Sequence, residues 1–162
     1  MIQMTNTAHN PAQSTDQRSA STVKPTTSTP SPVKGERRVQ ILQVLAQMLE
    51  NPEGEKITTA GLAKRLGVSE AALYRHFASK AQMFEGLIEF IETSVLGLLT
   101  QINQSDAGAV QKIQKSLHVL LAFAQKNPGM ARVLIGDVLL HENERLQLRV
   151  TQLIGRVQAS LK

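Results

Sequence analysis

The chain has 162 residues, with 18 Lys or Arg against 13 Asp or Glu and a formal net charge of +5. The absence of Cys excludes a disulfide framework, a thiolate zinc site and a cysteine nucleophile. No apolar run reaches the roughly 18 residues that cross a bilayer, so we expect no membrane partner. A modest positive charge is compatible with nucleic acid as a partner, and its placement matters more than its total.

Residues 1–35 differ in composition from the rest, because they hold twelve Ser or Thr and four of the six Pro. Such a segment cannot bury enough apolar surface to offset the entropy that it loses on ordering. We therefore expect a disordered Ser/Thr/Pro-rich tail over 1–35, with the fold carried by the residues that follow.

From residue 36 onward, apolar side chains recur at helical spacing, which predicts an all-α protein. Within the long helix 79–102, Leu98 is expected in the buried stripe. The helix 110–125 is apolar around much of its circumference, which is typical of a central helix, and His118 within it is expected to be a core histidine. Its predicted main stripe consists of Val110, Ile113, Leu117, Leu120 and Ala124. Helices are expected over 36–51, 58–66, 69–77, 79–102, 110–125, 130–135 and 146–162.

The segment 57–77 has the pattern of a helix-turn-helix unit. A threonine at Thr58 or Thr59 is expected to cap the first short helix, Gly67 to take the left-handed turn position, and Ser69 to cap the second helix. Small Ala63 lies where two crossing helices approach closely. This arrangement predicts a three-helix DNA-binding domain over 36–82, followed by a helical regulatory and dimerisation body over 83–162.

The second helix of this unit is predicted to enter the major groove of duplex DNA. Its outward face would carry two alanines, which allow close backbone approach and methyl contact with thymine, and two groups able to form hydrogen bonds. Threonine hydroxyls at the start of the first helix, a tyrosine and a lysine are candidate phosphate contacts. The candidates from this pattern are Thr58, Thr59, Ala71, Ala72, Tyr74, Arg75, His76 and Lys80, with Lys34, Arg37 and Arg38 in a flexible lead-in along the DNA backbone.

The motif Gly67-Val68-Ser69, followed by Leu73-Tyr74-Arg75-His76-Phe77 and then Ser79-Lys80, resembles the DNA-binding domain of the TetR family. The resemblance implies an all-α TetR-like fold, a homodimer and a palindromic operator in duplex DNA. Carried over by position, it adds Ser69 to the DNA-contacting set.

Further motifs resemble the nucleoid occlusion branch of that family. They are Ser69–Phe77, Met83-Phe84, Leu87–Glu92 and Lys126-Asn127-Pro128-Gly129. This wider resemblance implies a cytoplasmic, nucleoid-associated factor that inhibits assembly of the division protein FtsZ over the chromosome. In such proteins the FtsZ tail lies between the fourth and fifth helices.

The matching positions for the FtsZ tail are Phe90, Val119 and Lys126. Where a basic residue would help to hold an acidic FtsZ tail, this chain has Gly97-Leu98-Leu99 instead. The helices that pair TetR-family subunits are also missing by this comparison, so we expect the body to be incomplete at its C-terminus.

Two other hypotheses remain open. One is a ligand-responsive TetR-family repressor whose body binds a small apolar molecule, and the other is a protein-interaction fragment that no longer binds DNA. An enzyme is not expected, because Glu85, Glu89 and Glu92 have the spacing of a solvated helix face and no phosphate loop, serine elbow or zinc-protease motif is found. No cofactor is expected. A metal site is not expected either, although Asp137 and His141 have helical spacing with Glu142 and Glu144 nearby. The apolar face of the last helix, which also carries Arg145, Arg149 and Arg156, is attributed to subunit or core packing.

Overall fold

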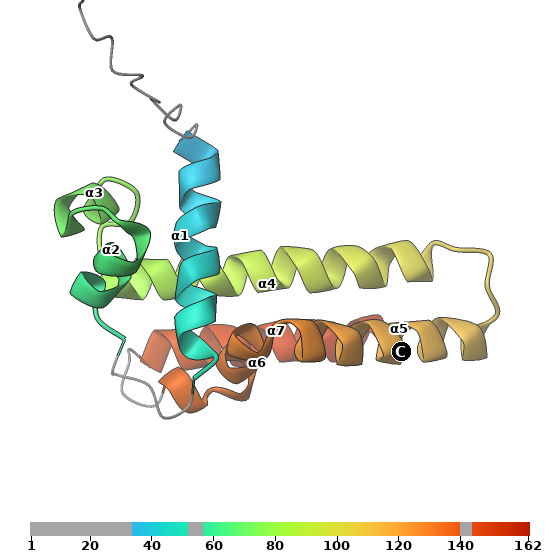
Figure 1. Cartoon of the computed structure of the whole chain (residues 1–162). Helices are drawn as coiled ribbons and strands as arrows, with labels where there is room; N and C mark the ends of the chain where they lie inside the picture. Colours follow the sequence, from blue (N-terminus) through green and yellow to red (C-terminus); the bar gives the residue numbers. More distant parts are fainter. Residues whose placement is uncertain (1–33, 52–56, 140–143) are drawn as a thin grey trace, which may run out of the picture. The chain divides into compact units, whose positions relative to one another are not determined.

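The computed structural model describes residues 34–51, 57–139 and 144–162, and these contain helices and turns but no strand (Figure 1). The all-α prediction is confirmed. The expected tail lies outside the described residues except for Lys34 and Gly35, which are helical. The elements are α1 (Lys34–Leu49), α2 (Thr59–Leu66), α3 (Glu70–Tyr74), α4 (Lys80–Asn103), α5 (Ala109–Lys126), α6 (Pro128–Ile135), the short 3-10 helix η1 (Asp137–Leu139) and α7 (Glu144–Ser160).

The long helix α4 is the centre of the fold, and α1, α5, α6 and α7 all pack against it. It buries Leu87, Ile88 and Ile91 completely. A single hydrophobic core extends from the side chains of α2 and α3 to those of α7. The core therefore joins the predicted DNA-binding unit to the helical body, which fixes the position of α2 and α3 relative to α4.

Helix α6 lies against the C-terminal half of α1. Gly129 is buried there, and a Cβ added to it would overlap the carbonyl oxygen of Ala46 in α1. Nearby, Nη1 of Arg132 donates a hydrogen bond of 2.8 Å to the carbonyl oxygen of Leu49, which ends α1. This bond satisfies one of the carbonyl groups that a helix leaves open at its C-terminus.

Helix α5 contradicts the prediction of a central helix. Its buried residue is Ser116, while Leu120 and Phe123 also pack on the core. The predicted stripe through Ile113 and Leu117 is displaced around the helix by about one residue, or roughly 100°. As a result the following apolar side chains are exposed: Val110 at 70%, Ile113 at 47%, Leu117 at 48% and Leu121 at 67%. His118, expected in the core, is also exposed.

Some helix boundaries differ from those expected. Helix α3 ends at Tyr74 rather than near Phe77, because the N–H of His76 bonds back only three residues, to the carbonyl oxygen of Leu73. Helix α6 begins two residues earlier than predicted, with Pro128 in its first turn, where the missing N–H costs no helical bond. On α4, Leu99 is buried and Leu98 is 41% exposed, so the burial predicted for Leu98 is wrong.

Candidate nucleic-acid interface

Short polar side chains and one glycine set the geometry of α2 and α3. The Thr58 hydroxyl accepts a hydrogen bond from the N–H of Gly61, and the Ser69 hydroxyl accepts one from the N–H of Ala72. Between the helices, Gly67 has φ +67, a left-handed conformation that favours glycine. The N–H of Val68 closes the turn on the carbonyl oxygen of Ala63 at 3.0 Å. These observations confirm the predicted caps and turn.

The two helices bury one face and expose the other. Leu62 and Ala63 of α2 are buried, as is Leu73 of α3, while Leu66 and Val68 pack on the core. On the opposite side of α3, Ala71 and Arg75 are exposed and Tyr74 is 46% exposed. Alanine methyl groups, a phenol and a guanidinium therefore share the solvent side of this short helix, as a helix that reads DNA requires.

A chain of hydroxyl groups connects α2 to α3. The Tyr74 hydroxyl donates to Oγ1 of Thr59 at 3.4 Å, and the Thr59 hydroxyl donates to Oε2 of Glu70 at 2.6 Å. Two predicted phosphate contacts are thus brought together at one surface. The acidic residue beside them was absent from the sequence-based set. No local pattern marks Glu70, because its partner lies eleven residues earlier in another helix.

The remaining predicted DNA contacts border this surface. Ala72 is half-buried, as is His76 at the end of α3. Lys80 begins α4 and is also half-buried, with its Nζ 5.7 Å from the centre of the Phe84 ring. Within the predicted set, Ala71, Tyr74 and Arg75 are therefore more accessible than Ala72, His76 and Lys80.

The flexible lead-in expected over Lys34, Arg37 and Arg38 is instead the first turns of α1. Arg38 has a structural role there: its Nη1 donates to the carbonyl oxygen of His76, and its guanidinium stacks 4.1 Å from the centre of the Phe77 ring. This cation–π contact and hydrogen bond hold the end of the α3 segment against α1. The spacing of 38 residues hides the contact from sequence analysis.

The three positions matched to FtsZ binding lie on adjacent helices, since α4 packs against α5. Phe90 is half-buried on α4 and packs on the core, and Val119 is half-buried on α5. Lys126 is exposed at the last residue of α5. The α4–α5 pair thus carries an aromatic ring at Phe90, an aliphatic side chain at Val119 and a positive charge at Lys126.

Acidic residues of α4 pair with arginines of α7, which corrects the prediction of a fully solvated acidic face. Glu92 accepts hydrogen bonds from Arg149 at 3.4 Å and from Arg156, and Arg145 lies 3.6 Å from Glu85. The Glu92 side chain is only 16% exposed. Glu89 alone of the three glutamates keeps the expected exposure. These pairs link α7 to α4 at the surface beside the buried contacts of Leu146, Val150 and Leu153, and they account for the arginines of the last helix.

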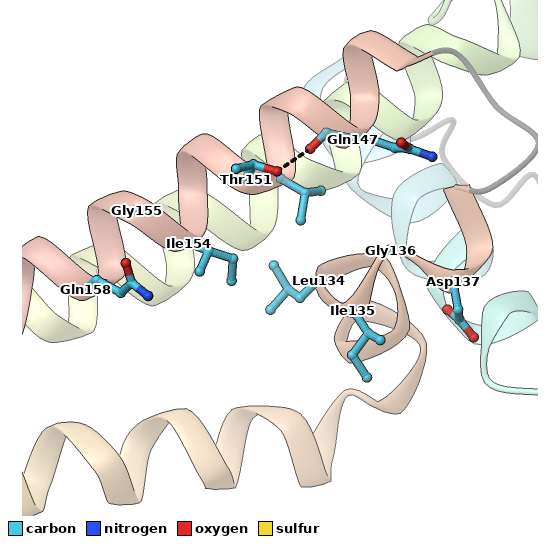
Figure 2. A pocket seen from close by; sticks show the side chains of 10 residues that line it. Leu134, Ile135, Gly136, Asp137, Gln147, Thr151, Ile154, Gly155 and Gln158 are labelled. Carbon is cyan, nitrogen blue, oxygen red and sulfur yellow. Dashed lines mark hydrogen bonds between the residues drawn. The ribbon is translucent and has the colours of Figure 1, made fainter.

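A hollow of about 640 Å³ is lined by residues of α6, of the turn that follows it and of α7. Figure 2 shows Leu134 of α6 and Ile154 of α7 pointing toward one another across it, with Gln147, Thr151 and Gln158 along the α7 side. Its volume falls within the range of small-molecule pockets.

The residues considered for a metal site do not form one in the described part of the chain. Asp137 pairs with Arg132 at 2.8 Å, while His141 and Glu142 lie outside the described residues. Among residues 34–51, 57–139 and 144–162, no three His, Cys, Asp or Glu side chains come together as a metal would require. Within the same ranges, no helix combines the length and apolar character of a membrane span.

Two family models match separate parts of the chain. Residues 55–87 match the family of bacterial regulatory proteins described as tetR family, and residues 108–162 match a tetracyclin repressor-like C-terminal domain. A TetR family transcription regulator from Marinobacter aquaeolei VT8 has a similar structure, with a TM-score of 0.60 over 78% of this chain and 67% of that one. At 15% sequence identity this likeness shows the fold alone.

Curated relatives are more similar in sequence. A nucleoid occlusion factor SlmA from Marinomonas sp. (strain MWYL1) is 54% identical over 129 residues, which is 80% of this chain and 66% of the relative. One from Shewanella amazonensis is 57% identical over 78% of this chain and 64% of its own length, and one from Vibrio campbellii is 52% identical over 80% and 66%. The chain thus spans slightly less than two thirds of these relatives. It belongs to the TetR family of bacterial regulatory proteins.

Proposed function

We propose that this chain is a sequence-specific DNA-binding nucleoid occlusion factor that inhibits FtsZ assembly over the chromosome. The observation that carries the proposal is the exposed face of α3, where Ala71, Tyr74 and Arg75 lie opposite the buried side of the helix. The similarity to nucleoid occlusion factors named SlmA supports the nucleoid occlusion role.

On DNA, Ala71, Ala72 and Arg75 read base edges in the major groove. The alanine methyl groups contact thymine, and the guanidinium of Arg75 donates to guanine. Phosphate oxygens accept hydrogen bonds from the groups that border α3, which set the orientation of the helix without reading sequence. These residues are Thr58, Thr59, Ser69, His76 and Lys80, together with Tyr74 at the end of α3.

The protein acts on a palindromic operator as a homodimer. A helix as short as α3 contacts few bases, and two copies on symmetric half-sites multiply the discrimination of one. Exposed apolar side chains on α5, α6 and α7 supply surface for self-association. Among them are Leu121, Ile135, which is 79% exposed, and Leu148, which is 58% exposed.

The FtsZ tail lies along the α4–α5 pair. Phe90 and Val119 offer apolar contact, and Lys126 offers a positive charge to an acidic peptide at the exposed end of α5. Such a protein acts in the cytoplasm, at the nucleoid. Of Gly97, Leu98 and Leu99, the first two are exposed and uncharged and Leu99 is buried, so Lys126 carries most of the electrostatic attraction.

Sedimentation of FtsZ polymers tests this proposal. The assay compares FtsZ alone, FtsZ with the protein, and FtsZ with the protein and a duplex that the protein has itself selected from a random pool. We expect the least FtsZ in the pellet when both protein and selected duplex are present. Lys126→Glu should restore the pellet, while Lys115→Glu, an equal charge change at an exposed position of the same helix, should not. An unchanged pellet with protein and duplex would contradict the FtsZ role.

A ligand-responsive repressor is the second candidate, and the hollow between α6 and α7 is the observation in its favour. Its apolar lining includes Leu134, Val150 and Ile154, so a small apolar molecule is the expected ligand. Release of the selected duplex by such a molecule, with no effect of the protein on FtsZ, would favour this function over the first.

A further inference from the structure

Glu70 places a carboxylate directly among the proposed phosphate contacts. It lies in the first turn of α3 and is exposed. Its Oε2 accepts the hydrogen bond from the Thr59 hydroxyl at 2.6 Å, and Thr59 in turn accepts from Tyr74 at 3.4 Å. Two hydroxyl hydrogens that DNA would use are therefore already directed along a chain that ends on an anion within the protein.

A carboxylate oxygen and a phosphate oxygen are acceptors of the same kind for a hydroxyl donor. To accept a hydrogen bond from Thr59 or Tyr74, a phosphate must replace Glu70 as the final acceptor of the hydroxyl chain. It must also approach the negative charge of Glu70. The repulsion between Glu70 and the phosphate is strongest at low salt, because screening between exposed charges increases with ionic strength.

We propose that Glu70 is a specificity-determining residue that competes with DNA phosphate for the Thr59 and Tyr74 hydroxyls. Nonspecific binding depends almost entirely on phosphate contacts, so it bears the full effect of this competition. In the complex with the selected duplex, base contacts hold α3 in a fixed position in the groove, so affinity there depends less on whether the Thr59 and Tyr74 hydroxyls reach a phosphate. Glu70 thereby lowers affinity for random DNA more than affinity for the operator. This inference rests on the proposed function, since it assumes that α2 and α3 face DNA.

Fluorescence anisotropy tests the role of Glu70 in specificity. It uses two labelled duplexes, one of random sequence and one selected by the wild-type protein. Glu70→Gln keeps the size of the side chain and an acceptor oxygen but removes the charge. We expect it to bind the random duplex about fivefold more tightly, the size of effect typical of one exposed charge interaction. Its affinity for the selected duplex should rise less, and the gain should shrink between about 50 and 200 mM salt.

Glu89→Gln is the matched control, because Glu89 is exposed on α4 and loses the same charge. Its affinity for the random duplex should stay within about twofold of wild type. Glu70→Ala carries the same expectation as Glu70→Gln and gives a second variant, since alanine is favourable at an exposed helical position. Equal affinity of both Glu70 variants and wild type for the random duplex would overturn the inference alone. Wild-type protein that binds neither duplex would overturn the proposed function together with it.

Discussion

The contact between α6 and α1 makes Gly129 the glycine whose replacement should damage the fold most. In Gly129→Ala the new Cβ overlaps the carbonyl oxygen of Ala46 and lies 2.9 Å from its carbonyl carbon, whereas ordinary contact begins at 3.4 Å. Both atoms belong to backbone, so one helix must move away from the other. That movement also strains the hydrogen bond from Arg132 to Leu49. Overpacking of this kind costs about 3 kcal/mol, of which the gain in helix propensity offsets less than 1 kcal/mol.

Thermal unfolding followed by circular dichroism measures the effect. For a domain of this size, the loss lowers Tm by about 10 °C. Gly155→Ala is the matched control, because Gly155 is an exposed residue of α7 with nothing within 4 Å of an added Cβ. Alanine there should raise stability by about 0.5 to 1 kcal/mol. A Gly129→Ala protein as stable as wild type would refute the reasoning that α6 packs through a glycine on the backbone of α1.

Two further substitutions test the site and the body. Tyr74→Phe should weaken binding to the selected duplex roughly fivefold, the value of one hydrogen bond, and leave the helical circular dichroism unchanged. Tyr74→Phe is a more specific test of DNA contact than Thr58→Ala, because Thr58→Ala also removes the cap of α2 and costs about 1 kcal/mol of stability. Glu92→Gln should lower the free energy of unfolding by about 0.5 to 1 kcal/mol through its arginine pairs. The Glu92 loss should diminish in high salt, and a loss independent of salt would indicate packing instead of charge.

The DNA-binding unit was predictable because its signals are local. The cap at Thr58, the left-handed turn at Gly67 and the cap at Ser69 each depend on residues within three or four positions. The spacing of Leu73 and Phe77, four residues apart, is local in the same way and puts both on one helical face, which is buried. Short-range hydrogen bonds and periodicity thus determine this part of the fold before any distant contact forms.

The errors concern contacts between residues far apart in the sequence. Helix α5 carries apolar side chains on several faces, so periodicity alone could not show that the face with Ser116 turns inward. The roles of Arg38 and Glu92 depend on partners 38 and 64 residues away. In the sequence, Gly129 stands out only as part of the motif Lys126-Asn127-Pro128-Gly129, and the packing of α6 on α1 shows why a side chain cannot fit there.

The central claim is that the exposed face of α3 reads DNA sequence. The most direct test measures the affinity of the purified chain for its selected duplex and for a scrambled duplex of equal composition at the same salt. If the exposed face of α3 reads DNA, the wild-type protein should prefer the selected duplex about a thousandfold, and Arg75→Ala should remove much of that preference. Equal affinity for both duplexes, or a preference that Arg75→Ala leaves intact, would contradict the claim.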